Sequence, residues 1–564
     1  MKNVSKMLTM IILLGCGLFC QLNGTAQKSK IITGEDYSRL SVTFLLGNYE
    51  GESASQEAAL AAEKIKFSDK YNNHNFKGFS LPLGQDFKTL TTTNKRSYLK
   101  DLIEKQGIGR AIVAKWFNRQ ENGTMNLDYV HQSGLYNATD QDVKIAATAK
   151  RGDAFLKDAG QNLVNKSYVL ILVPTELKSQ DDGKTRGWNS TYDVFLFKLQ
   201  FTPEVIATFY NAWPYDDDDV AIKTNKIAAF DTLSFKFTDV YSKPLLSAST
   251  IETLTSNKNP KSLSQLMDEL TNNMYQNTTF LLDKDLEDFR VKTKVSKISP
   301  TRAKIGKKEG LKCDQQYFIY QYKWNEKSGK AEPKRQAVVR ATGKIVDNRQ
   351  VATGSSPESR FYQTYGGSIK EGMILQQRLD IGFSTIAGYE TGGIGGMDLN
   401  FMIRTGPFTK ITALYLMIDL GFDSKEYNTS PFSADSKTEF SFFRYSIGLG
   451  KGMRLGRIIE LTPYAQYGIE QISNDKLKYK ATATSSEVAY KEISTSFIKA
   501  GAMLGINLTR NISILGQVNY YTPSGDISTK NEANEKAPIK DLTWTKAFDG
   551  REGMGIMAGI RFEF

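Results

Sequence analysis

The strongest constraint on the fold is a strict alternation of side chains in the last segment of the chain, residues 551–564. Apolar residues occupy every second position, and glycine, methionine or charged residues stand between them. A period of two residues is that of a β-strand, because successive side chains of a strand point to opposite faces. The two faces must therefore meet different environments. One face carries Met554, Ile556, Ala558, Ile560, Phe562 and Phe564; the other carries Gly553, Gly555, Met557, Gly559, Arg561 and Glu563.

Seven earlier segments repeat this alternation, so the C-terminal third predicts eight strands, an even number. In each of them one face is apolar and the other holds glycine, polar or charged side chains. No apolar run after the first twenty residues reaches about 18 residues, which excludes a polytopic helical membrane protein. The seven segments are 377–384, 397–404, 414–422, 443–449, 459–470, 498–507 and 512–520.

The connections between the predicted strands alternate in length. Short turns follow the second, fourth and sixth strands, at Gly406-Pro407, 451–456 and Arg510-Asn511, whereas long polar loops follow the third, fifth and seventh. Short turns at one end and long loops at the other are typical of an outer-membrane barrel. A soluble sandwich or a lipocalin-like barrel would also alternate, and the alternation alone does not tell which face is outside. The export signal described below, the loop asymmetry and the terminal Phe564 favour the membrane barrel.

Residues 371–564 resemble the small eight-stranded outer-membrane proteins of the OmpA/OmpX type. The terminal strand "GIMAGIRFEF" is similar to the segment by which such barrels are recognised for insertion, which implies this role for Phe562 and Phe564. The resemblance concerns architecture, so it implies location rather than activity.

The predicted inward face of this barrel is rich in charge. Eight strands enclose a space that side chains fill, and buried charges are costly unless they are paired. We therefore expect a salt-bridged plug; a conducting pore and a catalytic carboxylate pair are the alternatives. The glycine-rich segment 392–396 opens no helix and is expected to be a hairpin turn. The predicted lumen charges are Arg378, Asp380, Asp398, Arg404, Asp419, Arg444, Glu460, Glu470, Lys499, Arg561 and Glu563.

The N-terminus predicts export. Lys2 and Lys6 precede a short apolar core, and Gly24-Thr25-Ala26 supplies small residues for cleavage, so residues 1–26 are expected to be a signal peptide. A lipoprotein signal ending at Cys16 is the alternative. Cleavage after Ala26 leaves Cys313 as the one thiol, so no internal disulfide is expected. We expect Cys313 to be a small buried apolar side chain.

An even strand number places both ends of the barrel on one side of the membrane, so residues 27–370 are expected in the periplasm. The excess positive charge lies there, since residues 371–564 carry equal numbers of basic and acidic side chains. Segments 289–298, 313–324 and 334–346 predict a small β domain over 290–370. Its basic surface is expected to meet anionic lipid headgroups or peptidoglycan, or to be an ordinary solvated face, and nucleic acid is not expected. The candidate basic residues are Lys304, Lys307, Lys308, Lys312, Lys334 and Arg335.

Residues 27–289 predict a layered α/β domain. Helices are expected at 54–65, 96–107 and 262–274, with a further helical stretch at 140–164. Strands are expected at 109–117, 167–173 and 192–201.

Two further resemblances concern these N-terminal regions. The segments "RAIVAKWF", "SGLYNATDQD" and "LKDAGQNLVNKSYVLIL" resemble the periplasmic α/β core of CsgG-like envelope-assembly proteins. The segment "AKIGKKEGLKCDQQYFIYQ" is similar to a small β domain of flagellar-assembly proteins. These resemblances imply a binding or assembly module, and no functional residue is transferred from them.

Motifs of catalysis are not evident in the chain. HExxH, CxxC, GxSxG and P-loop patterns are missing, and His74 and His131 are the two histidines. The run 216–219 is four consecutive aspartates, which lack the spacing of a calcium loop and predict an exposed acidic turn. We therefore expect no cofactor, no metal and no enzyme. The favoured hypothesis is an outer-membrane protein whose barrel anchors a periplasmic module for an envelope partner or peptidoglycan; an Asp/Glu hydrolase and a small channel are the alternatives.

Overall fold

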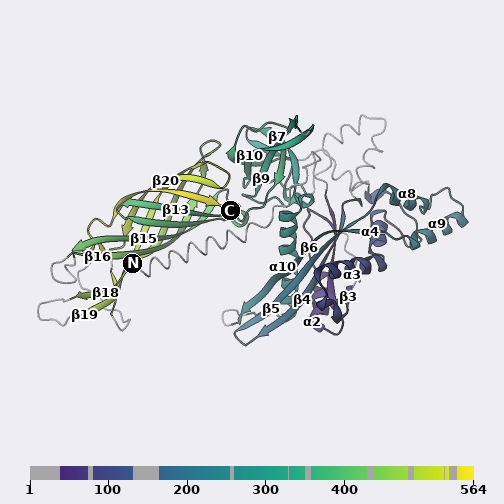
Figure 1. Cartoon of the computed structure of the whole chain (residues 1–564), viewed down its shortest axis with the longest axis horizontal. Helices are drawn as coiled ribbons and strands as arrows, with labels where there is room; N and C mark the ends of the chain where they lie inside the picture. The colour runs from purple at the N-terminus through teal and green to yellow at the C-terminus, as the bar shows by residue number, and fades with distance from the viewer. Residues whose placement is uncertain are drawn as a thin grey trace.

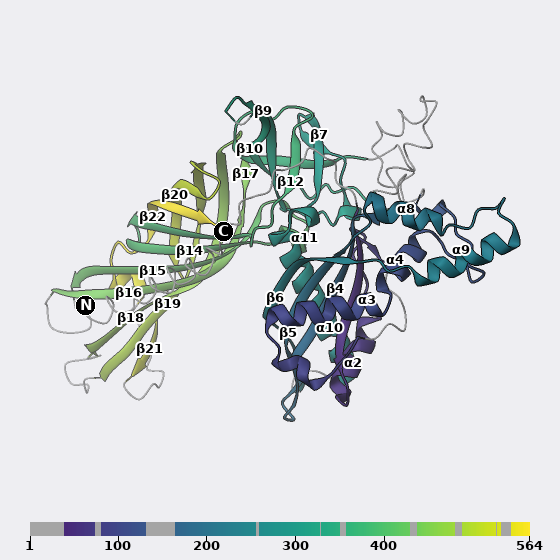
Figure 2. The ribbon, with the colours of Figure 1, turned by 45° about the vertical axis from the view of Figure 1, so that its right-hand side comes forward.

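The computed structural model describes residues 39–73, 81–130, 164–254, 259–327, 329–349, 357–428, 437–479, 488–525, 527–531 and 543–564. Three units follow one another along the chain: an α/β domain, a small closed β-barrel and a long β-barrel (Figure 1). The predicted multidomain architecture is confirmed. The small barrel lies against the end of the long barrel at which the chain terminates (Figures 1 and 2).

The α/β domain is built on one mixed sheet with the order β2-β1-β4-β5-β6, and β3 also pairs with β1. β1 runs parallel to β2, β3 and β4, whereas β4, β5 and β6 are antiparallel to one another in turn. The strands are β1 (Ser41–Tyr49), β2 (Asn72–Asn73), β3 (Leu81–Leu83), β4 (Ser167–Asp181), β5 (Thr185–Leu199) and β6 (Phe237–Thr253).

Helices cover both faces of this sheet. Alternate residues of β1, β4 and β5 are buried in two separate apolar clusters, one on each face. One cluster includes α3 (Thr92–Lys105), α4 (Ile108–Trp116), α8 (Pro203–Asn211) and α9 (Val220–Thr232); the other includes α2 (Ser53–Ala62) and α10 (Leu263–Asp285). Short 3-10 helices lie at Gln85–Thr89 and Glu287–Phe289.

The strand predicted at 109–117 is wrong, because these residues form helix α4. Gly109, Ile112, Val113 and Trp116 are buried on one side at helical spacing, and Trp116 Nε1 donates to Ser167 Oγ at 2.9 Å. The segment is so apolar that its pattern fits both the two-residue period of a strand and the 3.6-residue period of a helix. Packing against the sheet favours the helix. The resemblance to CsgG-like cores implied a strand at this segment, and the structure does not support that part of the resemblance. The helical stretch predicted at 140–164 lies outside the described residues except for its last position.

The small barrel is closed by six strands in the order β10-β11-β8-β7-β12-β9. Its interior is apolar and contains Val295, Tyr317, Ile319, Val339 and Leu375. A 3-10 helix lies at Lys307–Glu309. The strands are β7 (Lys292–Ile298), β8 (Thr301–Ala303), β9 (Gln316–Asn325), β10 (Lys330–Ala341), β11 (Ser359–Gly366) and β12 (Ile374–Gln377).

The first barrel strand was predicted at 377–384, and this is wrong. β12 belongs to the small barrel, where it pairs with β7 and β9, so that barrel reaches Gln377. Residues 378–382 connect the two barrels, and the long barrel begins at Phe383. The connecting residues happen to alternate in polarity, which imitates a strand.

The long barrel has eight antiparallel strands, closed by the pairs β13–β22 and β18–β19. Two short strands, β17 (Met453–Arg454) and β21 (Ser528–Asn531), and two short helices, α11 (Gly406–Thr409) and α12 (Trp544–Ala547), lie in its connections. The eight strands are β13 (Phe383–Gly392), β14 (Gly396–Arg404), β15 (Leu414–Asn428), β16 (Lys437–Lys451), β18 (Ile459–Tyr479), β19 (Val488–Asn507), β20 (Ile512–Pro523) and β22 (Gly553–Glu563).

The two faces of the long barrel differ sharply. On β16, Ile447 and Leu449 each expose 55% of their surface on the outside, whereas Arg444 is buried inside. An apolar exterior around a charged interior is the arrangement of a membrane-spanning barrel and the reverse of a lipocalin. None of the described helices is long and apolar enough to span a bilayer.

Candidate functional site

The centre of the long barrel is filled by one lysine and three carboxylates. Lys499 Nζ lies 3.0 Å from Glu390, 3.1 Å from Asp398 and 3.4 Å from Asp419. All four side chains are buried. Since each group comes from a different strand, this cluster ties β13, β14, β15 and β19 together across the lumen.

A second cluster lies towards the end of the barrel away from the small barrel, which we call the distal mouth. Arg551 bonds to Glu470 and Asp423 at 2.6 Å each, and Tyr521 donates to Glu470 at 2.7 Å. The Arg551 Cζ atom lies 3.5 Å from the centre of the Phe442 ring. Arg444 completes this cluster at 3.8 Å from Glu470.

An apolar cap closes the distal mouth above these charges. Helix α12 turns Trp544 and Phe548 into the barrel, where both are fully buried. Their ring centroids are 4.7 Å apart, and the Phe548 ring also lies 5.2 Å from Phe442. The cap residues are Tyr427, Phe440, Phe442, Ile472, Ile493, Trp544, Ala547 and Phe548.

A third cluster lies at the opposite end, which we call the proximal mouth. Glu460 accepts hydrogen bonds from the Tyr415 hydroxyl at 2.7 Å and from Arg561 at 3.2 Å, and it forms an ion pair with Arg454 at 2.7 Å. Beside it, Arg404 lies 2.9 Å from Glu563.

The small barrel enters this proximal cluster through Arg340 on β10. The Arg340 guanidinium bonds to Asp380 and lies 2.7 Å from Glu563, while it also donates to the Asp314 carbonyl at 2.8 Å. Arg340 is 1% exposed, so the junction excludes water from this cation. The two barrels therefore share one ion-pair network.

Further hydrogen bonds reinforce the junction. The Asp314 carboxylate accepts from Ala413 N at 2.9 Å and from the Tyr362 hydroxyl at 2.8 Å. Asn507 Nδ2 donates to the Thr364 carbonyl at 2.7 Å. Cys313 lies beside this contact, and burial raises the pKa of its thiol to about 11, as suits an inert buried side chain.

The structure places most of the predicted lumen charges inside the long barrel. Arg378 and Asp380 are exceptions and correct the prediction. Arg378 lies on the outside of the small barrel, 5.9 Å from the Phe318 ring, and Asp380 binds Arg340 at the proximal mouth. The charges found inside are Asp398, Arg404, Asp419, Arg444, Glu460, Glu470, Lys499 and Arg561, with Glu563 at the mouth.

Sequence reasoning missed several members of these clusters. Glu390 was missed because the first strand was placed too early, and Asp423 was missed because the third strand was predicted to end at 422. Arg551 lay inside the predicted last segment, 551–564, but was not assigned to the lumen, and it precedes β22 by two residues. Arg340 carries no signal in the sequence, since its partners lie 40 and 223 residues away. Phe562 and Phe564 end the last strand, and the Phe564 ring lies 6.1 Å from Phe383; their role in insertion stays a prediction.

The predicted basic residues do not form one patch. Lys307 pairs with Asp347 at 3.1 Å, Lys308 is half-buried, and Lys304, Lys312 and Lys334 are exposed. Arg335 stacks on Phe318, at 5.1 Å from its ring centre.

The aspartate run has a structural role at the start of α9. Asp219 accepts from Ile222 N at 2.8 Å and caps the helix, and Asp218 pairs with Lys226 at 2.7 Å. Within the part of the chain that the structure describes, no three His, Cys, Asp or Glu side chains are arranged to hold a metal ion.

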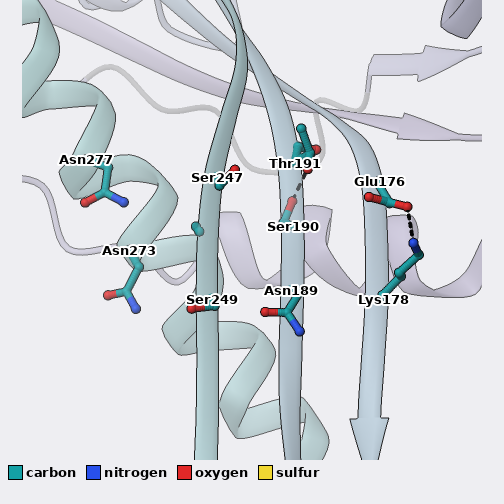
Figure 3. A pocket seen from close by; sticks show the side chains of 10 residues that line it. Glu176, Lys178, Asn189, Ser190, Thr191, Ser247, Ser249, Asn273 and Asn277 are labelled. Atoms are coloured by element: carbon teal, nitrogen blue, oxygen red, sulfur yellow. Dashed lines mark hydrogen bonds and ion pairs between the residues drawn. The ribbon is translucent and has the colours of Figure 1, made fainter. Parts of the chain in front are cut away.

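The α/β domain carries an open polar hollow of about 560 Å³ across β4, β5, β6 and α10 (Figure 3). Its lining is amide and hydroxyl side chains, with the Glu176–Lys178 ion pair at one side. A second hollow of about 450 Å³ shares Glu176 and Lys178 and extends towards the loop after β1. The amides and hydroxyls of the first hollow are neutral groups that can both donate and accept hydrogen bonds. The residues that offer them are Asn189, Ser190, Thr191, Ser247, Ser249, Asn273 and Asn277.

Comparison with known proteins finds likeness for about one third of the chain. No family model and no curated protein sequence matches it. A major outer membrane protein of Thermus thermophilus is 14% identical over 32% of this chain and 98% of its own, with a TM-score of 0.23. Ail, the attachment invasion locus protein of Yersinia pestis, is 14% identical over 32% of this chain and 99% of its own, with a TM-score of 0.19. The N-terminal β-barrel domain of Pseudomonas aeruginosa OprF is 11% identical over 33% of this chain and 100% of its own, with a TM-score of 0.18.

The fold of the C-terminal domain follows from its own strand order and faces. Its eight strands close on themselves, its lipid-facing side chains are apolar, and its lumen is charged. The C-terminal domain is therefore a closed eight-stranded antiparallel β-barrel of the outer-membrane type.

Proposed function

We propose that this protein is a non-enzymatic outer-membrane anchor that holds a binding module in the periplasm. The observation that carries the proposal is that the long barrel is filled and closed at both mouths. Its lumen is crossed by ion pairs, its distal mouth is capped by α12, and its proximal mouth is bonded to the small barrel through Arg340. A barrel filled in this way suits anchoring better than transport.

The even number of strands supports the proposed orientation. Both ends of the eight-stranded sheet lie at the proximal mouth, where β13 begins and β22 ends. The longest connection, residues 524–552 between β20 and β22, lies at the distal mouth, as expected for the cell exterior, although the connection from β13 to β14 at the same mouth is a three-residue turn, 393–395. The small barrel and the α/β domain then lie in the periplasm, after removal of residues 1–26.

The module's binding site is assigned to the polar hollow of Figure 3. Amides and hydroxyls suit a neutral, highly hydroxylated polymer, and the glycan strands of peptidoglycan have that chemistry. Asn273 and Asn277 are exposed on one face of α10, where a ligand can reach both side chains.

The test is co-sedimentation of the full-length protein with purified sacculi. Wild-type protein is expected to sediment with them, and the double variant N273A/N277A is expected to bind about tenfold more weakly because it loses two amides. Gln276→Ala is the matched control, since this exposed residue of α10 lies outside the hollow. If the double variant binds sacculi as tightly as wild type does, the hollow is not the binding site. Absence of sacculus binding, with a stoichiometric protein crosslinked to the module in cells, would replace peptidoglycan by that protein.

The channel alternative is tested separately in planar bilayers. The sealed lumen predicts no steady conductance for wild-type protein. Sustained single-channel currents would contradict the anchor role, whatever the module binds.

A further inference from the structure

Three arginines from distant parts of the chain converge on one phenylalanine. The Cζ atoms of Arg335, Arg378 and Arg510 lie 5.1, 5.9 and 5.5 Å from the centre of the Phe318 ring. Arg335 is on β10, Arg378 follows β12, and Arg510 is in the turn between β19 and β20 of the long barrel. Both barrels therefore contribute to this cluster, which we call the arginine triad.

Phe318 is on the outer side of the small barrel. Its neighbours Tyr317 and Ile319 point into the apolar core, and Phe318 does not belong to that core. Phe318 is nevertheless only 6% exposed, because guanidinium planes can lie over the faces of an aromatic ring. Tyr320 extends the aromatic surface, with its ring 6.3 Å from that of Phe318.

The triad carries positive charge without matching negative charge. None of its three guanidiniums forms an ion pair with the residues that the structure describes. Burial and then the charges of Arg335 and Arg378 lower the pKa of Arg510. Arg290 lies close enough that Arg378 also lowers its pKa, after burial. Two acids near Arg290 are already bound: Glu287 pairs with Lys292 at 2.7 Å, and Asp285 accepts a hydrogen bond from the Tyr241 hydroxyl at 2.7 Å. Cations held together in this way form a site of high positive potential.

The triad lies at the edge of the lipid-facing surface. Arg510 is flanked in its turn by Leu508 and Ile512, which expose 49% and 37% of their surface on the outside of the long barrel. Leu455 and Ile458, in the neighbouring turn, are also exposed. The three guanidiniums are thus placed where an apolar exterior ends, at the depth of lipid headgroups.

We propose that the arginine triad binds the phosphate of an anionic phospholipid headgroup in the membrane leaflet on the small-barrel side. Guanidinium is the side chain best suited to phosphate, because its planar donors bond to two phosphate oxygens at once. A bound phosphate relieves the repulsion among the three cations. It also bridges β10 of the small barrel to a turn of the long barrel, which fixes the small barrel against the membrane. This site is independent of the hollow on the α/β domain.

The test is native mass spectrometry of the full-length protein in detergent with phosphatidylglycerol as the probe. Wild-type protein is expected to retain one phosphatidylglycerol molecule. The triple variant R335Q/R378Q/R510Q is expected to bind it at least tenfold more weakly. The control K312Q/K334Q/K410Q removes the same charge from exposed positions outside the triad and is expected to bind as wild type does.

Two measurements keep the outcome clear. The single variant R510Q changes one residue of a short turn, so it should fold as wild type does and lose about threefold in affinity. Inorganic phosphate is titrated as a second probe. Binding of inorganic phosphate without phosphatidylglycerol would overturn the lipid as the source of the phosphate. Equal phosphatidylglycerol binding by wild type, R510Q and the triple variant would overturn the site itself.

Discussion

The two barrels of this protein are built on opposite patterns. The small barrel has an apolar interior of aliphatic and aromatic side chains and exposes lysines such as Lys334. The long barrel buries Lys499, Arg444 and Arg561 and exposes isoleucine and leucine. The strands of both follow the same period of two, so the surrounding solvent decides which face must be apolar. The exposed side chains of the small barrel suit water, and those of the long barrel suit hydrocarbon.

This contrast predicts the largest effect for loss of the central cation of the long barrel. Lys499→Met leaves Glu390, Asp398 and Asp419 buried without their common partner, which should destabilise the barrel by about 3–5 kcal/mol. Unfolding in urea from lipid vesicles measures this loss. Lys425→Met, at an exposed position of β15, is the control and should be nearly neutral. A loss below about 1 kcal/mol for Lys499→Met would show that the carboxylates take up protons instead of needing the lysine.

A pair of mirrored substitutions sharpens the contrast between the outer faces. Ile447→Lys puts a cation on the apolar exterior of the long barrel and should cost about 2–4 kcal/mol in a bilayer. The reverse change, Lys334→Ile on the exterior of the small barrel, should alter stability by less than about 0.5 kcal/mol. Both free energies come from the same urea titration, followed by signals from each barrel. Similar costs at the two positions would mean that the exterior of the long barrel does not face lipid.

A smaller effect is expected where the two barrels meet. Arg340→Met removes charged hydrogen bonds to Asp380 and Glu563 and should weaken the junction by about 1.5–3 kcal/mol. Hydrogen exchange and proteolysis of the connecting residues 378–382 should increase, while the lumen of the long barrel stays protected. Lys344→Met, at an exposed site of the small barrel, should leave both readouts unchanged. Unchanged exchange in Arg340→Met would show that the remaining contacts hold the junction alone.

The last effect concerns pH and the small barrel. Burial lowers the pKa of Lys308 from 10.5 to about 8. The unfolded chain therefore binds more protons than the folded one between these values, so stability should rise as pH increases from about 8 to about 10.5. Lys308→Met should abolish this rise, and the control Lys304→Met should retain it. A stability that falls over this pH range in wild type, but not in Lys308→Met, would reverse the sign of the predicted shift.

The sequence predicted best where one physical signal repeats. Alternation located seven of the eight strands of the long barrel, and it separated Arg444 and Lys499 from the lipid-facing residues. The same signal misplaced the first strand, because the connecting residues 378–382 alternate too. In the α/β domain the apolar segment 109–117 fitted both the strand period and the helix period, and it forms a helix because it packs across the face of the sheet.

The contacts that unite the domains were not predictable from the sequence. Arg340 looks like any other basic residue of a basic region, yet it is buried between the two barrels. The Phe318 ring and its three arginines come from four separate elements, and their meeting depends on the docked arrangement. Local patterns report which face of an element is apolar, but they do not report which two domains will touch.

The position of Arg340 has a consequence for the order of assembly. Its two carboxylate partners stand at opposite ends of the long-barrel sequence, Asp380 just before β13 and Glu563 at the end of β22. Pairing of β13 with β22, which sets Ser384 opposite Glu563, is what brings these carboxylates together. The binding place for Arg340 therefore exists only once the sheet has closed in the membrane. Docking of the small barrel through Arg340 is therefore expected to follow closure of the long barrel.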